Sequence, residues 1–436
     1  MIKNPVLWLL SSFLFAPFLL YAGGYIDEVY LVAGLVLVAY LILLVVNFEA
    51  GFLVLVFIRS SLDYVAQLSE AGSFNVAALA TMTIIVLGIF YIIYRKVNIF
   101  RYEEAGPFLI FIFFSAISLY QSTDLIESVS DWLRLWSALS VYLLTRILAN
   151  SLQKTRRIFM VILMSSLIPL SVACYQHFSG SALIEEDFGR LMGTFSHPNA
   201  FATYLVLMLA FCIAQVFEKQ YLVSKKVLLP LVLISMILLV MTFSRGAWIV
   251  FVFILTFMGL FRYRKVFLLI PVGVALLIFT MPMVLDRIYG LFDPSYTKSI
   301  SSWEWRMETW SELFPLFLQK PFFGHGLGMV NIEMGFRAHN DYLRLLVESG
   351  AAGFLSYLYL TWVVVRKTWI DYRGSSAPLV KSLNLGLLAV LFGFLVRQLA
   401  DNTLRHTVVL MYLWMFVALA RSAAIFYKKN PAGEVS

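Results

Sequence analysis

Charged residues are scarce in this sequence, and several chemical signatures are missing from it. Only 13% of the 436 residues are charged, whereas soluble domains carry about 25%. There is no His/Cys/carboxylate cluster at metal-ligand spacing, no Walker motif and no nucleophile elbow. We therefore expect no metal and no cofactor, and nothing supports a nucleophilic serine or an ATP-driven mechanism. The two cysteines, Cys174 and Cys212, lie in apolar stretches and predict buried thiols.

Apolar residues dominate instead, at 61% of the chain, with a mean hydropathy of +0.85. The apolar runs are continuous, so they predict helices that cross about 30 Å of hydrocarbon rather than alternating strands. We expect an all-α, polytopic membrane helix bundle of about 14 (12–14) transmembrane helices, the first of them retained rather than cleaved. The expected spans are 5–22, 28–46, 50–66, 74–94, 106–120, 130–149, 156–177, 198–217, 226–243, 246–261, 266–282, 341–366, 380–400 and 406–426.

The basic residues orient these spans. The net charge of +8 does not predict nucleic-acid binding, because excess Lys and Arg in membrane proteins collects in cytoplasmic loops. With the N-terminus inside and the sides alternating, nearly every basic cluster falls in a cytoplasmic connection, which favours an even span count. The opposite side receives the connections 178–197, 243–246, 283–340 and 401–405. These contain Arg190, Arg245 and Arg405, and Arg397 lies at the end of the preceding span. An anionic ligand on that face would account for these arginines.

We divide the chain into N-terminal spans (1–177), a transmembrane core (178–282), a periplasmic loop (283–340) and C-terminal spans with a cytoplasmic tail (341–436). Within the loop, Ser301 to Glu304 has the pattern of a capping box. We expect a short amphipathic helix to follow and to end near Pro315. It either lies on the membrane surface with its tryptophans among the headgroups or packs on the bundle as a lid.

His339 is the best-placed candidate for chemistry. It precedes the apolar helix that starts at 341, and a histidine can take a proton from a hydroxyl near neutral pH. Asp341 is a candidate to orient its ring. The alternative is that His339 only caps the helix together with Asn340 and Asp341.

Four arginines and their neighbours form the remaining candidates. Arg190 and Arg245 lie beside glycines in outer turns, where a guanidinium matches phosphate oxygens; the alternative is snorkelling to lipid headgroups. Arg344 and Glu348 have the spacing of a structural ion pair. Arg397 and Asp401 have the same spacing and either pair or line a cavity.

Two further features receive structural interpretations. Gly324-His325-Gly326-Leu327-Gly328 lacks the strand and the acidic residue of a dinucleotide loop, so we interpret it as a tight turn. His197 precedes Pro198 at the start of a span, which favours a capping role over catalysis.

Three stretches together resemble a known family. They are Arg190–Ala202, Thr242–Ala247, and Gly324–Gly328 followed by Ala338–Leu343 and Glu348–Gly353. Their order and spacing resemble the O-antigen ligase / O-antigen polymerase family of bacterial inner-membrane glycosyltransferases. The resemblance covers residues 188–358; the first 150 residues are similar only in being apolar spans.

The resemblance implies a GT-C-like enzyme, active at the periplasmic face of the inner membrane without metal or nucleotide sugar. It implies an undecaprenyl-pyrophosphate-linked glycan donor and a glycan or lipid A-core acceptor. Arg190 and Arg245 would hold the pyrophosphate, and His339 would be the general base for an inverting displacement. Asn340, Asp341, Arg397, Asp401 and Arg306 would support them.

Two functional questions stay open at this point. The motif does not separate polymerases from ligases, although the compact Arg190–Asn199 form is more similar to polysaccharide polymerases. A flippase or secondary transporter for lipid-linked oligosaccharides is the main alternative, and it predicts midplane charges and inverted repeats. The charges cluster at one face instead, and no repeat stands out. A scaffold without catalysis would leave the outer arginines unexplained.

Overall fold

The computed structural model describes residues 28–68, 76–185, 188–271, 273, 275, 302–335 and 338–430. The chain divides into two compact units, Met1–Arg59 and Ser60–Ser436, with the boundary inside α4. The first unit contains α3 (Glu28–Val46) and the start of α4 (Phe48–Leu68), which form at the expected spans 28–46 and 50–66. The expected span 5–22 and most of 266–282 lie outside the described residues.

The second unit is built from helices that follow the apolar runs. They are α5 (Val76–Tyr94), α6 (Ala105–Ser118), α7 (Leu125–Leu148), α8 (Leu152–Ser165), α9 (Leu167–Ser179), α10 (Pro198–Val216), α11 (Lys225–Met241), α12 (Arg245–Phe261), α15 (Ser302–Gln319), α16 (Met329–Met334), α17 (Asp341–Gly374), α18 (Pro378–Arg397) and α19 (Thr407–Lys429). Short 3-10 turns occur at Ile99–Arg101, Leu119–Gln121, Arg264–Leu268 and Thr403–Arg405. The fold is all-helical apart from a small hairpin of β1 (Leu183–Glu185) and β2 (Phe188–Arg190), which the sequence did not predict.

Among the described residues, four helices are long and apolar enough to cross a membrane. They are Leu152–Ser179, Pro198–Val216, Pro378–Arg397 and Thr407–Lys429. Shorter apolar helices lie at Gly34–Val46, Ala78–Tyr94, Ala105–Gln121 and Arg245–Phe261. These four helices are candidate membrane spans by their length and composition, and the total of 14 stays a prediction.

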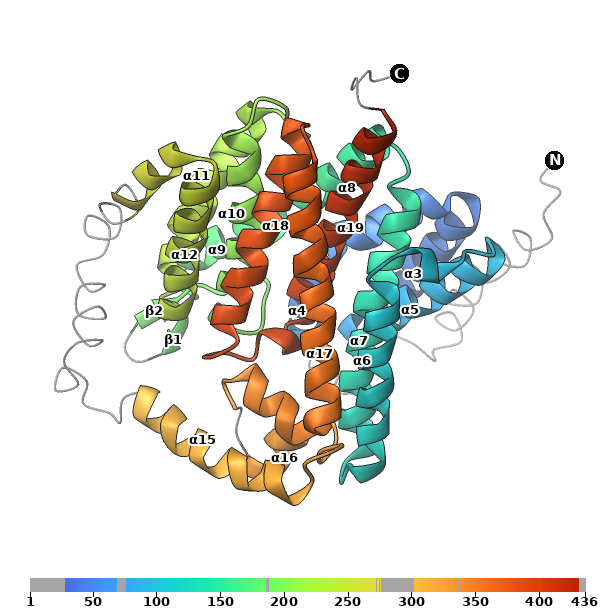
Figure 1. Cartoon of the computed structure of the whole chain (residues 1–436), viewed down its shortest axis with the longest axis vertical. Coiled ribbons are helices and arrows are strands. Elements are labelled where there is room, and N and C mark those ends of the chain that lie inside the picture. The colour runs from blue at the N-terminus through green and yellow to red at the C-terminus, as the bar shows by residue number, and fades with distance from the viewer. Residues whose placement is uncertain are drawn as a thin grey trace. The chain divides into compact units, whose positions relative to one another are not determined.

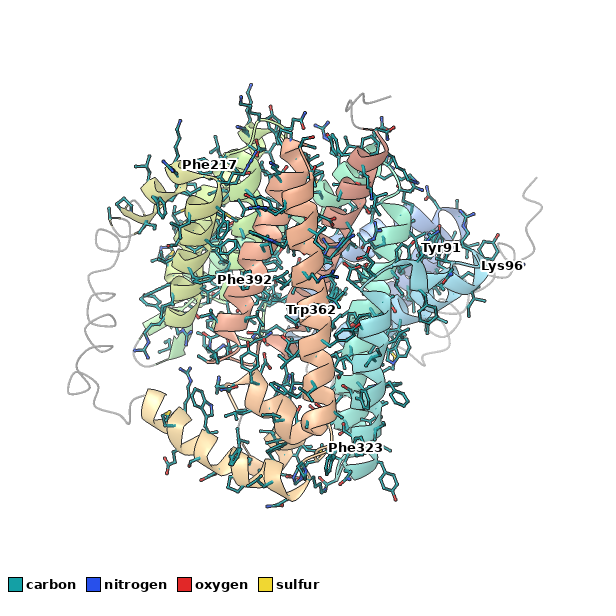
Figure 2. All side chains as sticks on the ribbon, viewed as in Figure 1. Tyr91, Lys96, Phe217, Phe323, Trp362 and Phe392 are labelled. Atoms are coloured by element: carbon teal, nitrogen blue, oxygen red, sulfur yellow. The ribbon has the colours of Figure 1, made fainter. Side chains whose placement is uncertain are left out.

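Helix α10 lies in the middle of the second unit and is almost wholly buried. It packs against α11, α12, α18 and α19, while α17 packs on α6 and α19 on α7 (Figure 1). Phe211 of α10 stacks on Phe416 of α19 with ring centroids 3.8 Å apart. Aromatic side chains run along the whole length of the unit, from Phe217 near one end past Trp362 to Phe323 at the other (Figure 2).

Ion pairs connect residues near the helix ends at both ends of this unit. At one end, Arg262 binds Glu218 at 2.7 Å, and Arg421 binds Glu104 at 2.6 Å. At the other end, Arg405 binds Glu127 at 2.5 Å. The pairs Arg262–Glu218 and Arg405–Glu127 thus each join two connections of the same expected side.

The expected span 156–177 lies within the apolar helical stretch Leu152–Ser179. It is divided at Ser166 into α8 and α9. Pro169 has no N–H to donate to the carbonyl of Ser165, so the helical hydrogen-bond ladder is interrupted there.

Helix α15 differs from the sequence prediction in where it ends, and its packing bears on its expected position. It continues through Pro315 to Gln319, so the prediction that it ends at the proline is wrong. Leu316 and Phe317 pack against the buried cluster of Leu313, Val330, Ala338 and Val347, and this burial offsets the hydrogen bond that Pro315 cannot donate.

Trp310 also faces inward in α15, and its indole N–H donates to the Ala338 carbonyl at 2.9 Å. This face of the helix therefore packs on α16 and α17, as the lid alternative proposed. Met307 and Phe314 are more than half exposed on another face. Contact of that face with a membrane surface stays a prediction.

The glycine-rich turn after α15 packs against a break inside α17. Gly350 has φ +65° and ψ −172°, which divides α17 into two helical parts. The freed carbonyls of Val347 and Glu348 accept from the N–H groups of His325 and Gly326, both at 2.9 Å. Across the break, Ala351 N–H donates to Pro321 O at 2.8 Å and Ala352 N–H to Phe322 O at 3.1 Å. The turn predicted from the glycines therefore closes both ends of the break.

Replacing Gly350 by alanine is expected to lower the free energy of unfolding by at least about 2 kcal/mol. Its backbone conformation is essentially restricted to glycine, and an added Cβ would lie 2.4 Å from backbone atoms of Phe322. Thermal unfolding in detergent measures the effect. Gly374→Ala is the matched control, because nothing lies within 4 Å of a Cβ there. Equal stability of the two variants would contradict the restriction.

Candidate active site

His339 lies in the turn that leads into α17, and its backbone is unusual. Its φ of +47° is in the left-handed region, which few residues other than glycine adopt. Asn340 is the residue that caps α17, since its Oδ1 accepts from the N–H groups of Tyr342 and Leu343 at 3.0 and 3.1 Å. Capping is thus provided by Asn340, and it does not explain the presence of a histidine at position 339.

The carboxylate that faces His339 is that of Asp401, not of Asp341. The distance from His339 Nδ1 to Asp401 Oδ1 is 3.9 Å. Asp341 is fully buried; its Oδ1 accepts from Arg344 Nε at 3.1 Å and its Oδ2 from the Leu404 N–H at 2.9 Å. Asp401 is therefore a better candidate than Asp341 to orient the ring of His339.

Asp401 also pairs with Arg397, the last residue of α18. Arg397 Nη2 lies 2.7 Å from Asp401 Oδ2, and both side chains are buried. Burial alone would raise the pKa of Asp401, but Arg397, His406 and His339 together lower it below its ordinary value of 3.8 to about 2. Asp401 thus remains an anion beside His339. Of the two alternatives for Arg397 and Asp401, the structure shows an ion pair.

Asn199, in the first turn of α10, connects this pair to Arg190. Its carbonyl accepts from Arg397 Nη2 at 3.3 Å. Its side-chain Oδ1 accepts from Arg190 Nη2 at 3.0 Å and from Ser244 Oγ at 2.9 Å. Arg190 also donates through Nε to the Thr242 carbonyl at 3.0 Å, so its guanidinium joins β2 to the ends of α10 and α11.

The turn Ser244–Gly246 at the start of α12 meets the same group. A Cβ on Gly246 would lie 3.1 Å from Arg397 Nη1, so the glycine allows this guanidinium to come close. Phe243, just before the turn, has a φ of +51°. Arg245, half-buried, is the first residue of α12.

Arg306 of α15 is close enough to interact with this group electrostatically. Burial and the positive charge of Arg397 lower the pKa of Arg306, while Asp401 opposes the shift. The cluster around Asp401 contains Arg190, Arg306 and Arg397, and Arg245 lies in the turn beside Arg397. An excess of fixed positive charge is therefore concentrated here.

Three helix N-termini also meet at the cluster. Asn199, Arg245 and Asp341 lie in the first turns of α10, α12 and α17. Each N-terminus carries partial positive charge and backbone N–H groups that favour anions. Residues 190, 245 and 339, far apart in sequence, are thus assembled into a site suited to an anionic ligand.

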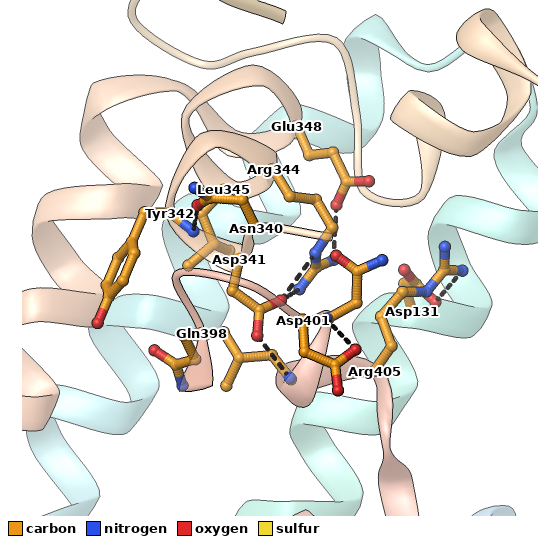
Figure 3. Close-up of polar contacts among 12 residues, drawn as sticks. Asp131, Asn340, Asp341, Tyr342, Arg344, Leu345, Glu348, Gln398, Asp401 and Arg405 are labelled. Atoms are coloured by element: carbon orange, nitrogen blue, oxygen red, sulfur yellow. Dashed lines mark hydrogen bonds and ion pairs between the residues drawn. The ribbon is translucent and has the colours of Figure 1, made fainter. Parts of the chain in front are cut away.

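A second charged network lies beside the first (Figure 3). Arg344 binds Glu348 at 2.8 Å and Asp341 at 3.0 Å, so the predicted structural pairing of Arg344 and Glu348 is confirmed. Arg405 binds Glu127 at 2.5 Å and Asp131 at 3.2 Å and thereby anchors the loop after α18 to α7. Both guanidinium groups of this network are thus paired, and its carboxylates outnumber them.

Sequence reasoning missed Asn199, the residue that connects the most parts of this site. His197, two residues earlier, accepts through Nδ1 from the Asn199 N–H at 3.0 Å and caps α10 as predicted. In the sequence, a role for Asn199 was indicated only by its position inside the stretch Arg190–Ala202. Among the described residues, no group of three His, Cys, Asp or Glu side chains is arranged to hold a metal ion.

The comparison with protein families bears on the middle of the chain. Residues 229–358 match the family model described as O-Antigen ligase. This part of the chain is therefore similar to the O-antigen ligase family. The O-antigen ligase match includes Ser244–Gly246 and His339, while Arg190 and the Arg397–Asp401 pair lie on either side of it. No curated protein matches the chain.

Proposed function

We propose that the protein transfers a glycan from an undecaprenyl-pyrophosphate carrier to a hydroxyl group of an acceptor. The observation that carries this proposal is the single linked group formed by Arg190, Asn199, Arg397, Asp401 and His339. It places one titratable base next to a concentration of positive charge. O-antigen ligase or polymerase activity in general agrees with the family match.

The positive charge suits the leaving group of such a reaction. A lipid pyrophosphate carries negative charge both when bound and when it leaves, and guanidinium groups match its oxygens in geometry and sign. Arg245, at a helix N-terminus, and Arg190 are the proposed pyrophosphate ligands. Arg397 and Arg306 add charge from the other side of the site.

His339 is the proposed general base. It removes the proton of the acceptor hydroxyl while that oxygen bonds to the anomeric carbon of the donor sugar. The bond from this carbon to the pyrophosphate oxygen breaks on the opposite face, so the configuration inverts and the lipid pyrophosphate leaves. Asp401, held anionic by Arg397, stabilises the imidazolium that forms.

The proposed location is the outer face of the bacterial inner membrane, with the bundle of GT-C-like architecture. The outer face is supported by the segregation of basic connections to the other end. The acceptor is a growing glycan for a polymerase or lipid A core for a ligase. The flippase alternative loses support, because the arginines around His339 cluster at one end of the unit rather than at its midplane.

Deleting the gene and separating the host's surface polysaccharide on a gel tests the proposal. Loss of the ladder to a single-repeat product is expected for a polymerase. Long chains that stay on the carrier lipid are expected for a ligase. Unchanged surface chains together with undisturbed carrier intermediates would refute both.

A further inference from the structure

The loop Asp401–His406 between α18 and α19 contains polar groups that the catalytic cluster does not use. Among the described residues, neither Nδ2 nor Oδ1 of Asn402 has a hydrogen-bond partner, although the residue is only 3% exposed. Buried amides are nearly always hydrogen-bonded, because an unpaired one loses its hydration without compensation. The Asn402 amide therefore needs an explanation.

The usual local reason for an asparagine at this position does not apply. Asn402 precedes the 3-10 turn Thr403–Arg405, where an asparagine normally caps the turn with its side chain. Here Asp341 Oδ2 accepts from the Leu404 N–H at 2.9 Å, and Asn402 makes no side-chain cap. Asp341 has taken the capping role, which leaves the Asn402 amide available.

Arg405 presents a second available donor nearby. Its N–H donates to the Asn402 carbonyl at 3.1 Å, so the two residues lie at the two ends of one short turn. Arg405 Nη2 binds Glu127 and Asp131, whereas the buried Nη1 has no hydrogen-bond partner among the described residues. A cavity of about 20 Å³ lies beside Arg405, also lined by Asp131, Arg134 and Arg344. It has room for one hydroxyl group or water molecule.

The surroundings distinguish this place from the proposed pyrophosphate site. Asp401 lies between the Asn402 amide and the proposed pyrophosphate site. Its Oδ2 faces Arg397. Its Oδ1 accepts from the Asn402 N–H at 2.9 Å and faces His339. Beyond Asp401 lie the carboxylates of Asp341, Glu127 and Asp131, which pair with Arg344 and Arg405. In this environment the carboxylates outnumber the guanidinium groups, which disfavours a diphosphate but accepts an uncharged hydroxyl.

We propose that Asn402 and Arg405 Nη1 form the subsite that binds hydroxyl groups of the acceptor sugar next to His339. An amide offers both a donor and an acceptor, and a guanidinium N–H adds another donor, which is the combination that adjacent sugar hydroxyls satisfy. This inference rests on the proposed function. Asn402 holds the acceptor on one side of Asp401, and Arg190 and Arg245 hold the pyrophosphate of the donor on the other side.

The test uses the full-length protein in detergent with Asn402→Ala and the size-matched Asn402→Leu. Lipid-linked long-chain glycan from wild-type membranes is the donor, kept saturating, and single-repeat lipid-linked glycan from the deletion strain is the acceptor, varied in concentration. We expect the acceptor KM to rise about tenfold or more, since a polar subsite left unmatched discriminates strongly. The affinity for undecaprenyl pyrophosphate alone should not change.

Asn384→Leu is the matched control. Asn384 is also buried, but its amide donates to the Val380 carbonyl at 2.8 Å within α18. This variant should lower the unfolding temperature without raising the acceptor KM. An unchanged acceptor KM in Asn402→Leu, as expected if the amide binds only an internal water, would overturn the inference. So would weaker binding of undecaprenyl pyrophosphate in both Asn402 variants. Transfer that persists in His339→Ala would refute the proposed function instead.

Discussion

Glycan transfer is expected to fall by roughly a thousandfold when His339 is replaced by alanine. The imidazole is the proposed acceptor of the hydroxyl proton, and Asp401, 3.9 Å from Nδ1, is the carboxylate that stabilises its protonated form. Alanine removes the base but leaves the arginines and the helix N-termini in place. The affinity for undecaprenyl pyrophosphate should therefore remain close to that of the native protein. Transfer by purified protein and binding of undecaprenyl pyrophosphate are the two measurements.

His177→Ala is the control for this experiment. His177 is exposed in the last turn of α9 and should be dispensable. If His339→Ala instead reduced the amount of protein in the membrane or lowered its unfolding temperature substantially, the histidine would be structural. We expect the start of α17 to persist in His339→Ala, because the cap of this helix is made by the side chain of Asn340 and not by that of His339.

Replacing Arg397 by alanine is expected to damage both stability and transfer. Arg397 is 4% exposed, binds Asp401 at 2.7 Å and reaches the Asn199 carbonyl. Without it, Asp401 is left as a buried carboxylate without its partner, which costs about 3–5 kcal/mol. The unfolding temperature in detergent should fall clearly, and transfer should be lost because His339 and Asn199 lose their common support.

A double variant separates the two effects. Arg397→Leu with Asp401→Leu removes both charges, so much of the stability should return while transfer stays absent. Arg373→Ala, an exposed arginine near the end of α17, is the control and should change neither property. Full activity in the double variant would show that the ion pair serves only the fold.

Much of the helical architecture followed from hydropathy alone. The expected span 28–46 coincides with α3, and the helices α10, α12, α18 and α19 lie within a few residues of their expected bounds. Continuous apolar runs predict such helices because in hydrocarbon every backbone group must bond within its own segment. Pro315 and the break at Gly350 were not predictable in the same way. A proline is tolerated and a helix is interrupted only when packing elsewhere compensates, as Leu316 and the turn at His325 do here.

The sequence alone determined which residues could do chemistry and at which end of the spans they would lie. His339, Arg190 and Arg245 were recognisable from their types, their positions at span ends and the resembling stretches. Only the tertiary structure decided how they are connected. Asn199 and Asp401 became visible as the connecting residues when α10, α12 and α18 packed together, and Asp341 turned away from His339 toward Leu404. The physical reason is that membrane insertion depends on each segment separately, whereas hydrogen bonds between residues 198 positions apart depend on how all the segments pack.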